Sequence, residues 1–101
     1  MPEMYFQVRW PDGRTQRCYS PSTVVEDFFA AGVSYPLLDF VERSRQALTI
    51  ASERVRARYG FACSSAADQL TEIEATAAAY RSVPRAAVTV EAITLANGRA
   101  R

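Results

Sequence analysis

The feature that most constrains the fold is a tight-turn signal between two short alternating segments. Residues 4–10 alternate between apolar and polar side chains, which is the period of a strand with one buried face. The apolar face comprises Met4, Phe6, Val8 and Trp10. Pro11-Asp12-Gly13 follows, where proline presets φ and glycine can adopt the left-handed conformation. The sequence therefore predicts an antiparallel hairpin whose second strand covers residues 15–19.

Three segments after the hairpin carry helical patterns. Residues 23–31 predict a short helix that stops at Gly32. A second helix begins near Ser34, which can cap it, has Pro36 in its first turn and ends at Gly60. Its apolar stripe comprises Leu37, Val41, Ser44, Leu48, Ala51, Val55 and Tyr59. A third helix starts near Ser64, and its stripe comprises Ala66, Leu70, Ile73, Ala77 and Tyr80.

Residues 88–95 are rich in β-branched side chains and alternate in part, which indicates a last strand. We therefore expect an α+β fold in which a small three-stranded antiparallel sheet, the N-terminal hairpin plus the C-terminal strand, packs against a short helix and a long antiparallel helix pair. The 101 residues fit a single domain over residues 1–101, with an ordered core over about residues 3–95. An exposed sheet edge or the Phe28-Phe29 pair predicts a homodimer, which light scattering would test.

The chain has no histidine and no lysine, so arginine supplies all twelve of its positive side chains. This excludes Ser-His and Cys-His pairs, imidazole metal ligands, Schiff bases and the P-loop lysine. There is no Gly-rich phosphate loop, and the carboxylates lack the spacing of metal ligands, so we expect no cofactor and no metal site.

The charge balance and hydropathy limit the classes of partner that this chain is expected to bind. A net charge of +1 argues against nucleic-acid binding, which relies on an excess of positive charge. No apolar run approaches the roughly 20 residues that span a bilayer, and the N-terminus does not resemble a signal peptide. We therefore predict no membrane association and a cytoplasmic location.

Two cysteines are the remaining source of nucleophilic chemistry. Cys18, on a predicted strand, is expected to be a small buried hydrophobe. Cys63 precedes the start of the third helix, and a helix N-terminus stabilises a thiolate. We assign no catalytic residue, and Cys63 is the one candidate.

Most arginines of the second helix have a carboxylate three or four residues away, which is typical of a solvated helix face. The pairs are Asp39 with Arg43, Glu42 with Arg45, and Glu53 with Arg56. Arg45, Arg54 and Arg58 lie nearer the apolar stripe and are the arginines that such pairing explains least. Ile50 projects among charged side chains on the polar side, which indicates a contact surface.

Several segments resemble the small mycobacterial-type nitrogen starvation response family. They are residues 1–13, 17–22, 34–37, 39–40, 42–45, 47–48, 50–56 and 59–64. The similarity covers about residues 1–80 and is weak over the last twenty. The resemblance implies a bacterial gene cluster with a nitrilase, a radical SAM protein, an acetyltransferase and an aminoimidazole-ribotide-synthase-like protein, linked to nitrogen or nitrile and cyanide assimilation. It implies no established catalytic residue.

The resulting hypothesis is a non-catalytic accessory protein that binds an enzyme or intermediate of that cluster. Its predicted binding residues are Arg45, Arg54, Arg58, Tyr59, Phe61, Cys63 and Ser64. Two alternatives stay open: a small thiol-dependent enzyme with Cys63 as nucleophile supported by Arg58, and a small-anion sensor in which Arg45, Arg54 or Arg58 holds a carboxylate or phosphate.

Overall fold

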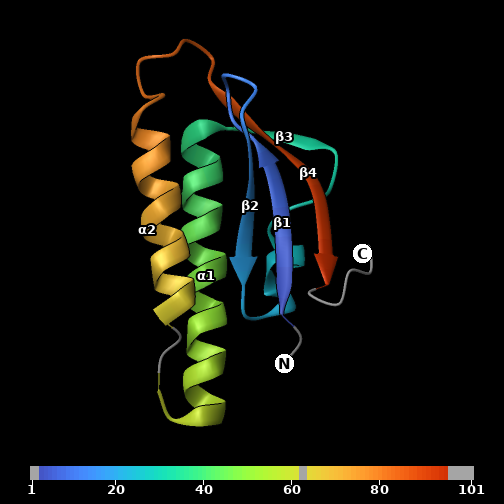
Figure 1. Cartoon of the computed structure of the whole chain (residues 1–101), viewed down its shortest axis with the longest axis vertical. Coiled ribbons are helices and arrows are strands. Elements are labelled where there is room, and N and C mark those ends of the chain that lie inside the picture. Colours follow the sequence, from blue (N-terminus) through green and yellow to red (C-terminus); the bar gives the residue numbers. More distant parts are fainter. Residues whose placement is uncertain (1–2, 62–63, 96–101) are drawn as a thin grey trace.

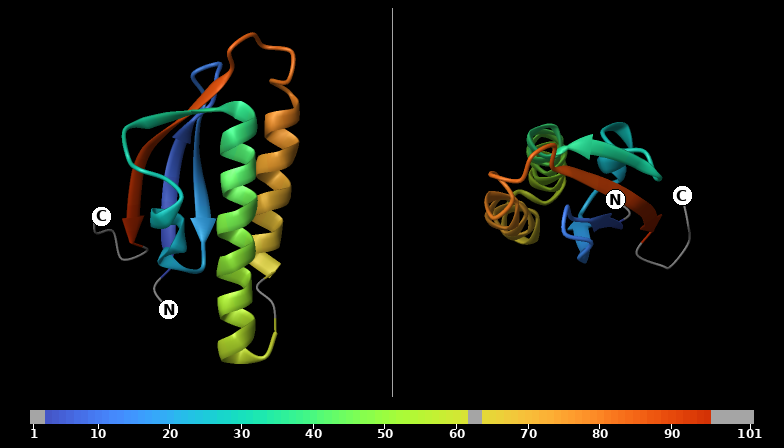
Figure 2. Two further views of the ribbon diagram at one scale, coloured as in Figure 1. Left: turned by 180° about the vertical axis from the view of Figure 1, so that it is seen from behind. Right: turned by 90° about the horizontal axis from the view of Figure 1, so that it is seen from above.

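The computed structural model describes residues 3–61 and 64–95, which form two layers (Figure 1). The elements are β1 (Met4–Arg9), β2 (Thr15–Ser20), the 3-10 helix η1 (Thr23–Asp27), β3 (Val33–Pro36), α1 (Leu37–Tyr59), α2 (Ser64–Ala78) and β4 (Ala87–Leu95). The strands form an antiparallel sheet in the order β2-β1-β4-β3. The helices α1 and α2 lie side by side and cover one side of the sheet, as the view from above shows (Figure 2).

The predicted hairpin is confirmed. β1 pairs with β2 from Met4 opposite Ser20 to Arg9 opposite Thr15. The predicted apolar face of the first strand is buried along its whole length. Gly13 has a φ of 90° and donates its N–H to the Trp10 carbonyl at 2.9 Å, so a glycine is needed where the chain reverses.

The sheet has four strands, and our expectation of three was wrong. The additional strand, β3, pairs with β4 at the opposite edge from β2. Ser34 belongs to this strand, where its Oγ lies 2.6 Å from the Thr89 Oγ1, so it does not cap α1. Pro36 is the N-cap residue of α1 instead. Sequence patterns do not reveal β3 because four residues are too few to show a period, and its hydrogen bonds come from a strand more than fifty residues away.

The predicted short helix begins at Thr23 as expected, but it is the 3-10 helix η1 and ends at Asp27, so its expected extent to residue 31 was wrong. The Ser22 Oγ caps its start by accepting the Val24 N–H at 3.3 Å. Phe29 then turns into the core, where its ring packs on those of Phe6 and Phe40 at 5.7 and 5.3 Å. Phe28 is half-buried and packs against the same core. The homodimer stays a prediction.

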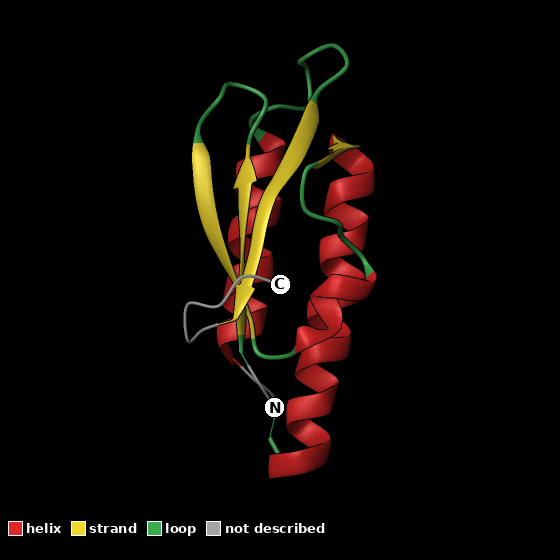
Figure 3. Ribbon diagram, turned by 90° about the vertical axis from the view of Figure 1, so that its right-hand side faces the viewer, coloured by secondary structure: helices red, strands yellow, loops and turns green. Residues whose placement is uncertain are grey.

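Both long helices are confirmed, but α2 ends at Ala78, before Tyr80 of its predicted stripe. The buried face of α1 is shorter than its apolar stripe. Its buried residues are Leu37, Phe40, Ser44, Ala47, Leu48 and Ala51. The last turns of α1 run past the strands and past the start of α2 (Figures 1 and 3). Val55 is therefore only partly buried, and Tyr59 is 55% exposed.

The last strand is confirmed, and a β-bulge explains its imperfect alternation. Val8 pairs with Val90 and Gln7 with Ala92, so Glu91 has no residue opposite it in β1. The buried side chains change accordingly from Val88 and Val90 to Ile93. Glu91 accepts hydrogen bonds from Gln7 and Arg9, which lower the pKa of its carboxyl group, that of Gln7 most.

Candidate functional site

The end of α1 that runs past the sheet is the most exposed part of the helix layer. From Glu53 to Phe61 every residue except Val55 is exposed. Tyr59 and Phe61 are 55% and 67% exposed, and their ring centroids lie 6.5 Å apart. We call this region the distal α1 surface and define it by Ile50, Arg54, Arg58, Tyr59 and Phe61.

Local chemistry ends the helix at this surface and brings the two rings together. Gly60 adopts a left-handed φ of 84° and donates its N–H to the Arg56 carbonyl at 2.8 Å, which terminates α1. Arg56 and Arg58 lie in the last turn, where positive charge stabilises the negative end of the helix dipole. The chain therefore turns back directly after Tyr59, and Phe61 remains beside it.

Two of the predicted arginines lie on one side of this surface. Ile50, Arg54 and Arg58 follow each other at intervals of four residues and so share a helix face. The Arg54 Nη1 donates to the Ser22 Oγ at 3.0 Å, and the Arg58 guanidinium lies 5.8 Å from the centre of the Tyr59 ring. Neither arginine forms an ion pair with an acidic residue in the part of the chain that the structure describes.

Arg45 does not belong to this group. It donates to Glu42 on its own helix and to the Glu74 Oε2 of α2 at 2.8 Å. The hydrogen bond with Glu74 is the main reason that the pKa of the Arg45 guanidinium is raised. Arg45 and Arg54 are nine residues apart, which places them about 180° apart around the helix. Arg45 links the two helices, and the three arginines do not converge on one point.

Two of the three predicted ion pairs between arginines and carboxylates on the surface of α1 form. Arg43 contacts Asp39 at 2.9 Å, and Arg45 contacts Glu42. Among the described residues, Glu53 and Arg56 make no ion pair with each other. The protruding helix end therefore carries three positive side chains, including Arg56, against the single carboxylate of Glu53.

The two cysteines and Ser64 are the remaining residues that the sequence singled out. Cys63, the catalytic candidate, lies outside the described residues. Ser64, the last of the predicted binding residues, is exposed at the start of α2. Cys18 is completely buried, as predicted, and desolvation raises the pKa of its thiol to about 12, with the charge of Glu72 adding to the effect.

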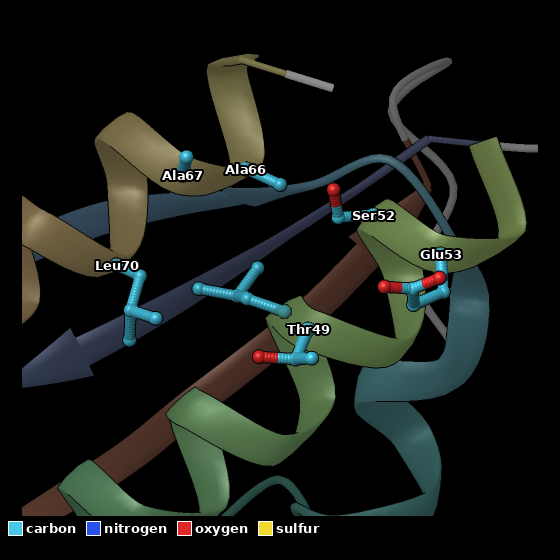
Figure 4. Close-up of a pocket in the computed structure, with 7 residues that line it drawn as sticks. Thr49, Ser52, Glu53, Ala66, Ala67 and Leu70 are labelled. Carbon is cyan, nitrogen blue, oxygen red and sulfur yellow. The ribbon is translucent and has the colours of Figure 1, made fainter. Parts of the chain in front are cut away.

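A cavity between the helices was missed by sequence reasoning. It has a volume of about 170 Å³ and lies where Thr49, Ser52 and Glu53 of α1 face the first turns of α2 (Figure 4). Its other lining residues are Leu48, Ala66, Ala67 and Leu70. Small-molecule sites usually measure about 300 to 1,000 Å³, so this cavity is small for a ligand. Thr49 and Ser52 lie outside the predicted apolar stripe, so the stripe gave no signal for this cavity.

The described residues contain no group of three or more histidine, cysteine, aspartate or glutamate side chains that could hold a metal ion. None of the helices within residues 3–61 and 64–95 has the length and apolar character needed to cross a membrane.

The fold and the distal α1 surface define a small two-layer α+β protein that displays arginine and aromatic side chains on a projecting helix end. The chain belongs to the family of the nitrogen starvation-induced protein NitG, whose family model matches residues 5–93. The match confirms the family resemblance predicted from the sequence, and it extends through most of β4. No curated protein and no solved structure matches the chain.

Proposed function

We propose that this protein is a non-catalytic accessory protein that binds another protein through the distal α1 surface. The observation that carries the proposal is the pair of exposed rings, Tyr59 and Phe61, with the Arg58 guanidinium 5.8 Å from the centre of the Tyr59 ring. Arg54 lies one helical turn before Arg58 on the same side of α1. Tyrosine and arginine are enriched among the residues that dominate binding energy at protein interfaces.

Simpler explanations account for single features of this surface. A lone exposed apolar residue is ordinary, and arginines in the last turn stabilise the helix end. They do not explain why two neighbouring rings stay more than half exposed on a helix end that runs past the sheet. A partner with an apolar pocket and an acidic rim would cover the rings and pair with the arginines.

The family resemblance suggests which partners to try first. It implies that members are encoded beside a nitrilase, a radical SAM protein, an acetyltransferase and an aminoimidazole-ribotide-synthase-like protein. We propose that this protein is cytoplasmic and that one of these four proteins, or a complex of one with its reaction intermediate, is its partner.

Co-purification with each of the four cluster proteins tests the proposal. We expect at least one to be retained, and we expect Tyr59→Ser with Phe61→Ser to weaken retention about tenfold or more, as for interface residues of high binding energy. Leu38→Ser is the matched control, because Leu38 is 77% exposed but lies at the opposite end of α1. Retention of none of the four, with the purified protein turning over a substrate alone, would reject an accessory role. Equal losses in the double variant and the control would reject the surface.

The two alternatives make different predictions. A thiol enzyme requires an activated Cys63, so a pKa near the ordinary value of about 8.5 in pH-dependent alkylation would remove it. An anion sensor would rely on Arg54 and Arg58, since Arg45 is held by Glu42 and Glu74. Thermal-shift measurements with nitrogen metabolites test the sensor, which requires that some anion stabilise the fold.

A further inference from the structure

A second, larger hollow lies at the other end of the helix pair from the distal α1 surface. It has a volume of about 490 Å³, within the usual range of small-molecule sites, and lies between the start of α1 and the loop that joins α2 to β4. We call it the loop pocket. It is lined by Pro36, Leu37, Leu38, Tyr80, Arg81, Val83, Arg85 and Ala86.

The walls of the loop pocket are mainly apolar. Leu38 and Val83 are 77% and 42% exposed, which is unusual for large apolar side chains that flank a single hollow. Tyr80 is buried and stacks on the Trp10 ring with 5.7 Å between centroids. A ligand in the pocket would therefore shield two exposed side chains and contact a ring that is fixed in the core.

The charge at this pocket is positive. Arg81 and Arg85 both line it, and neither forms an ion pair with any residue that the structure describes. Three carboxylates that adjoin the lining residues already have cationic partners: Asp12 interacts with Tyr80, Asp39 follows Leu38, and Glu74 lines a neighbouring hollow. The ion pairs are Asp12 with Arg14 at 3.6 Å, Asp39 with Arg43 at 2.9 Å and Glu74 with Arg45 at 2.8 Å. Within the described part of the chain, no carboxylate therefore competes with an anion that binds these two arginines beside the apolar walls.

The loop that carries these arginines has a defined shape. The Val83 N–H donates to the Tyr80 carbonyl at 3.0 Å, and the Leu37 N–H donates to the Ala86 carbonyl at 3.0 Å, which ties the loop to the first residue of α1. Arg85 has a φ of 56°, a left-handed conformation that is uncommon for a residue other than glycine. Such backbone conformations persist where the surrounding structure imposes them.

We propose that the loop pocket binds a small amphipathic carboxylate. Arg81 or Arg85 holds the carboxylate, and the apolar chain lies against Leu38, Val83 and Tyr80. A smaller hollow of about 150 Å³ shares Leu38 and Arg81 with the loop pocket and continues between α1 and α2, which leaves room for a longer chain. An inorganic anion would leave the apolar walls uncovered, and a neutral apolar molecule would leave both arginines without a partner.

The protein contains a reporter for this test. Trp10 is its single tryptophan, and it stacks on Tyr80, which lines the pocket. We expect titration with octanoate to change the tryptophan fluorescence saturably. Octylamine has the same apolar chain and the opposite charge, so it should produce no saturable change. An equal response to both compounds, or a response to neither, would overturn the proposal.

Variants locate the site. Arg81→Gln with Arg85→Gln should weaken octanoate binding about tenfold or more, because charge-assisted hydrogen bonds are lost. Arg56→Gln, in the last turn of α1 at the other end of the protein, is the matched control and should bind octanoate normally. Unchanged binding in the double variant would overturn the proposal. A different result would also overturn it: the protein does not bind octanoate, dimerises as its concentration rises, and loses this dimerisation in the Leu38→Ser variant. A second copy of the chain would then occupy the pocket.

Discussion

Cys18 shows at the scale of one residue how burial changes chemistry. Its side chain lies in the core on β2, and loss of solvation raises the pKa of the thiol to about 12. Its buried position was predicted from the general tendency of free cysteines to be buried. The chemical consequence is a thiol that stays protonated at neutral pH, because the thiolate would be charged in an apolar environment.

We expect Cys18 in the native protein to resist alkylation by iodoacetamide at pH 8, because the thiolate is the reactive form. Mass spectrometry of a Cys63→Ser variant would measure this, since Cys18 is then the only thiol. The same variant unfolded in urea is the control and should react as an ordinary cysteine. Rapid labelling of the native variant would contradict the burial and the raised pKa.

At the scale of elements, the end of α1 depends on the backbone of Gly60. An added Cβ would meet no atom within 4 Å, so a substitution there acts through the left-handed φ of 84° and not through a clash. The position of this glycine after a long helical pattern was sufficient to predict where α1 ends.

We expect Gly60→Ala to lower the free energy of unfolding by about 1 kcal/mol, because alanine is strained in the left-handed region. Gly60→Asn should cost less, since asparagine tolerates that region better. Urea denaturation of the three proteins would measure the difference. Equal stability of Gly60→Ala and the wild type would show that α1 does not need a left-handed residue at its end.

At the scale of the whole molecule, Trp10 connects both layers. Trp10 is the residue directly after β1. Its ring stacks on that of Tyr80, which follows α2, and packs edge-on against the Phe40 ring of α1 with 5.6 Å between centroids. Its Nε1 donates to the Gln16 Oε1 at 2.8 Å, which ties it to β2 as well. Because one residue contacts so many elements, the sheet and the helices should unfold together.

We expect urea unfolding followed by Trp10 fluorescence and by far-UV circular dichroism to give coincident transitions. Ile73→Val, in the buried face of α2, should lower the free energy of unfolding by about 1 kcal/mol, because it removes one methylene from the core. Both unfolding curves should then move to lower urea concentration together. A loss of helical signal before the fluorescence change would instead show that the helix pair unfolds as a separate unit.

Sequence patterns by themselves determined the hairpin, the two long helices, the last strand and the α+β class. The reason is physical: alternation, helical periodicity and turn residues such as Gly13 and Gly60 act between close neighbours in the chain. The turn from Tyr59 to Ser64 was singled out from its sequence as well, although Tyr59 was placed on the apolar stripe of the helix and is 55% exposed.

Only the tertiary structure decided features that depend on distant partners. β3 exists because β4 supplies its hydrogen bonds, and η1 is short because Phe29 enters the core between β1 and α1. Arg45 pairs with α2, whereas Arg54 and Arg58 stay free of carboxylates among the described residues, because the packing of the helices sets which side of α1 faces α2. The loop pocket forms between segments more than forty residues apart, so no local pattern could predict it.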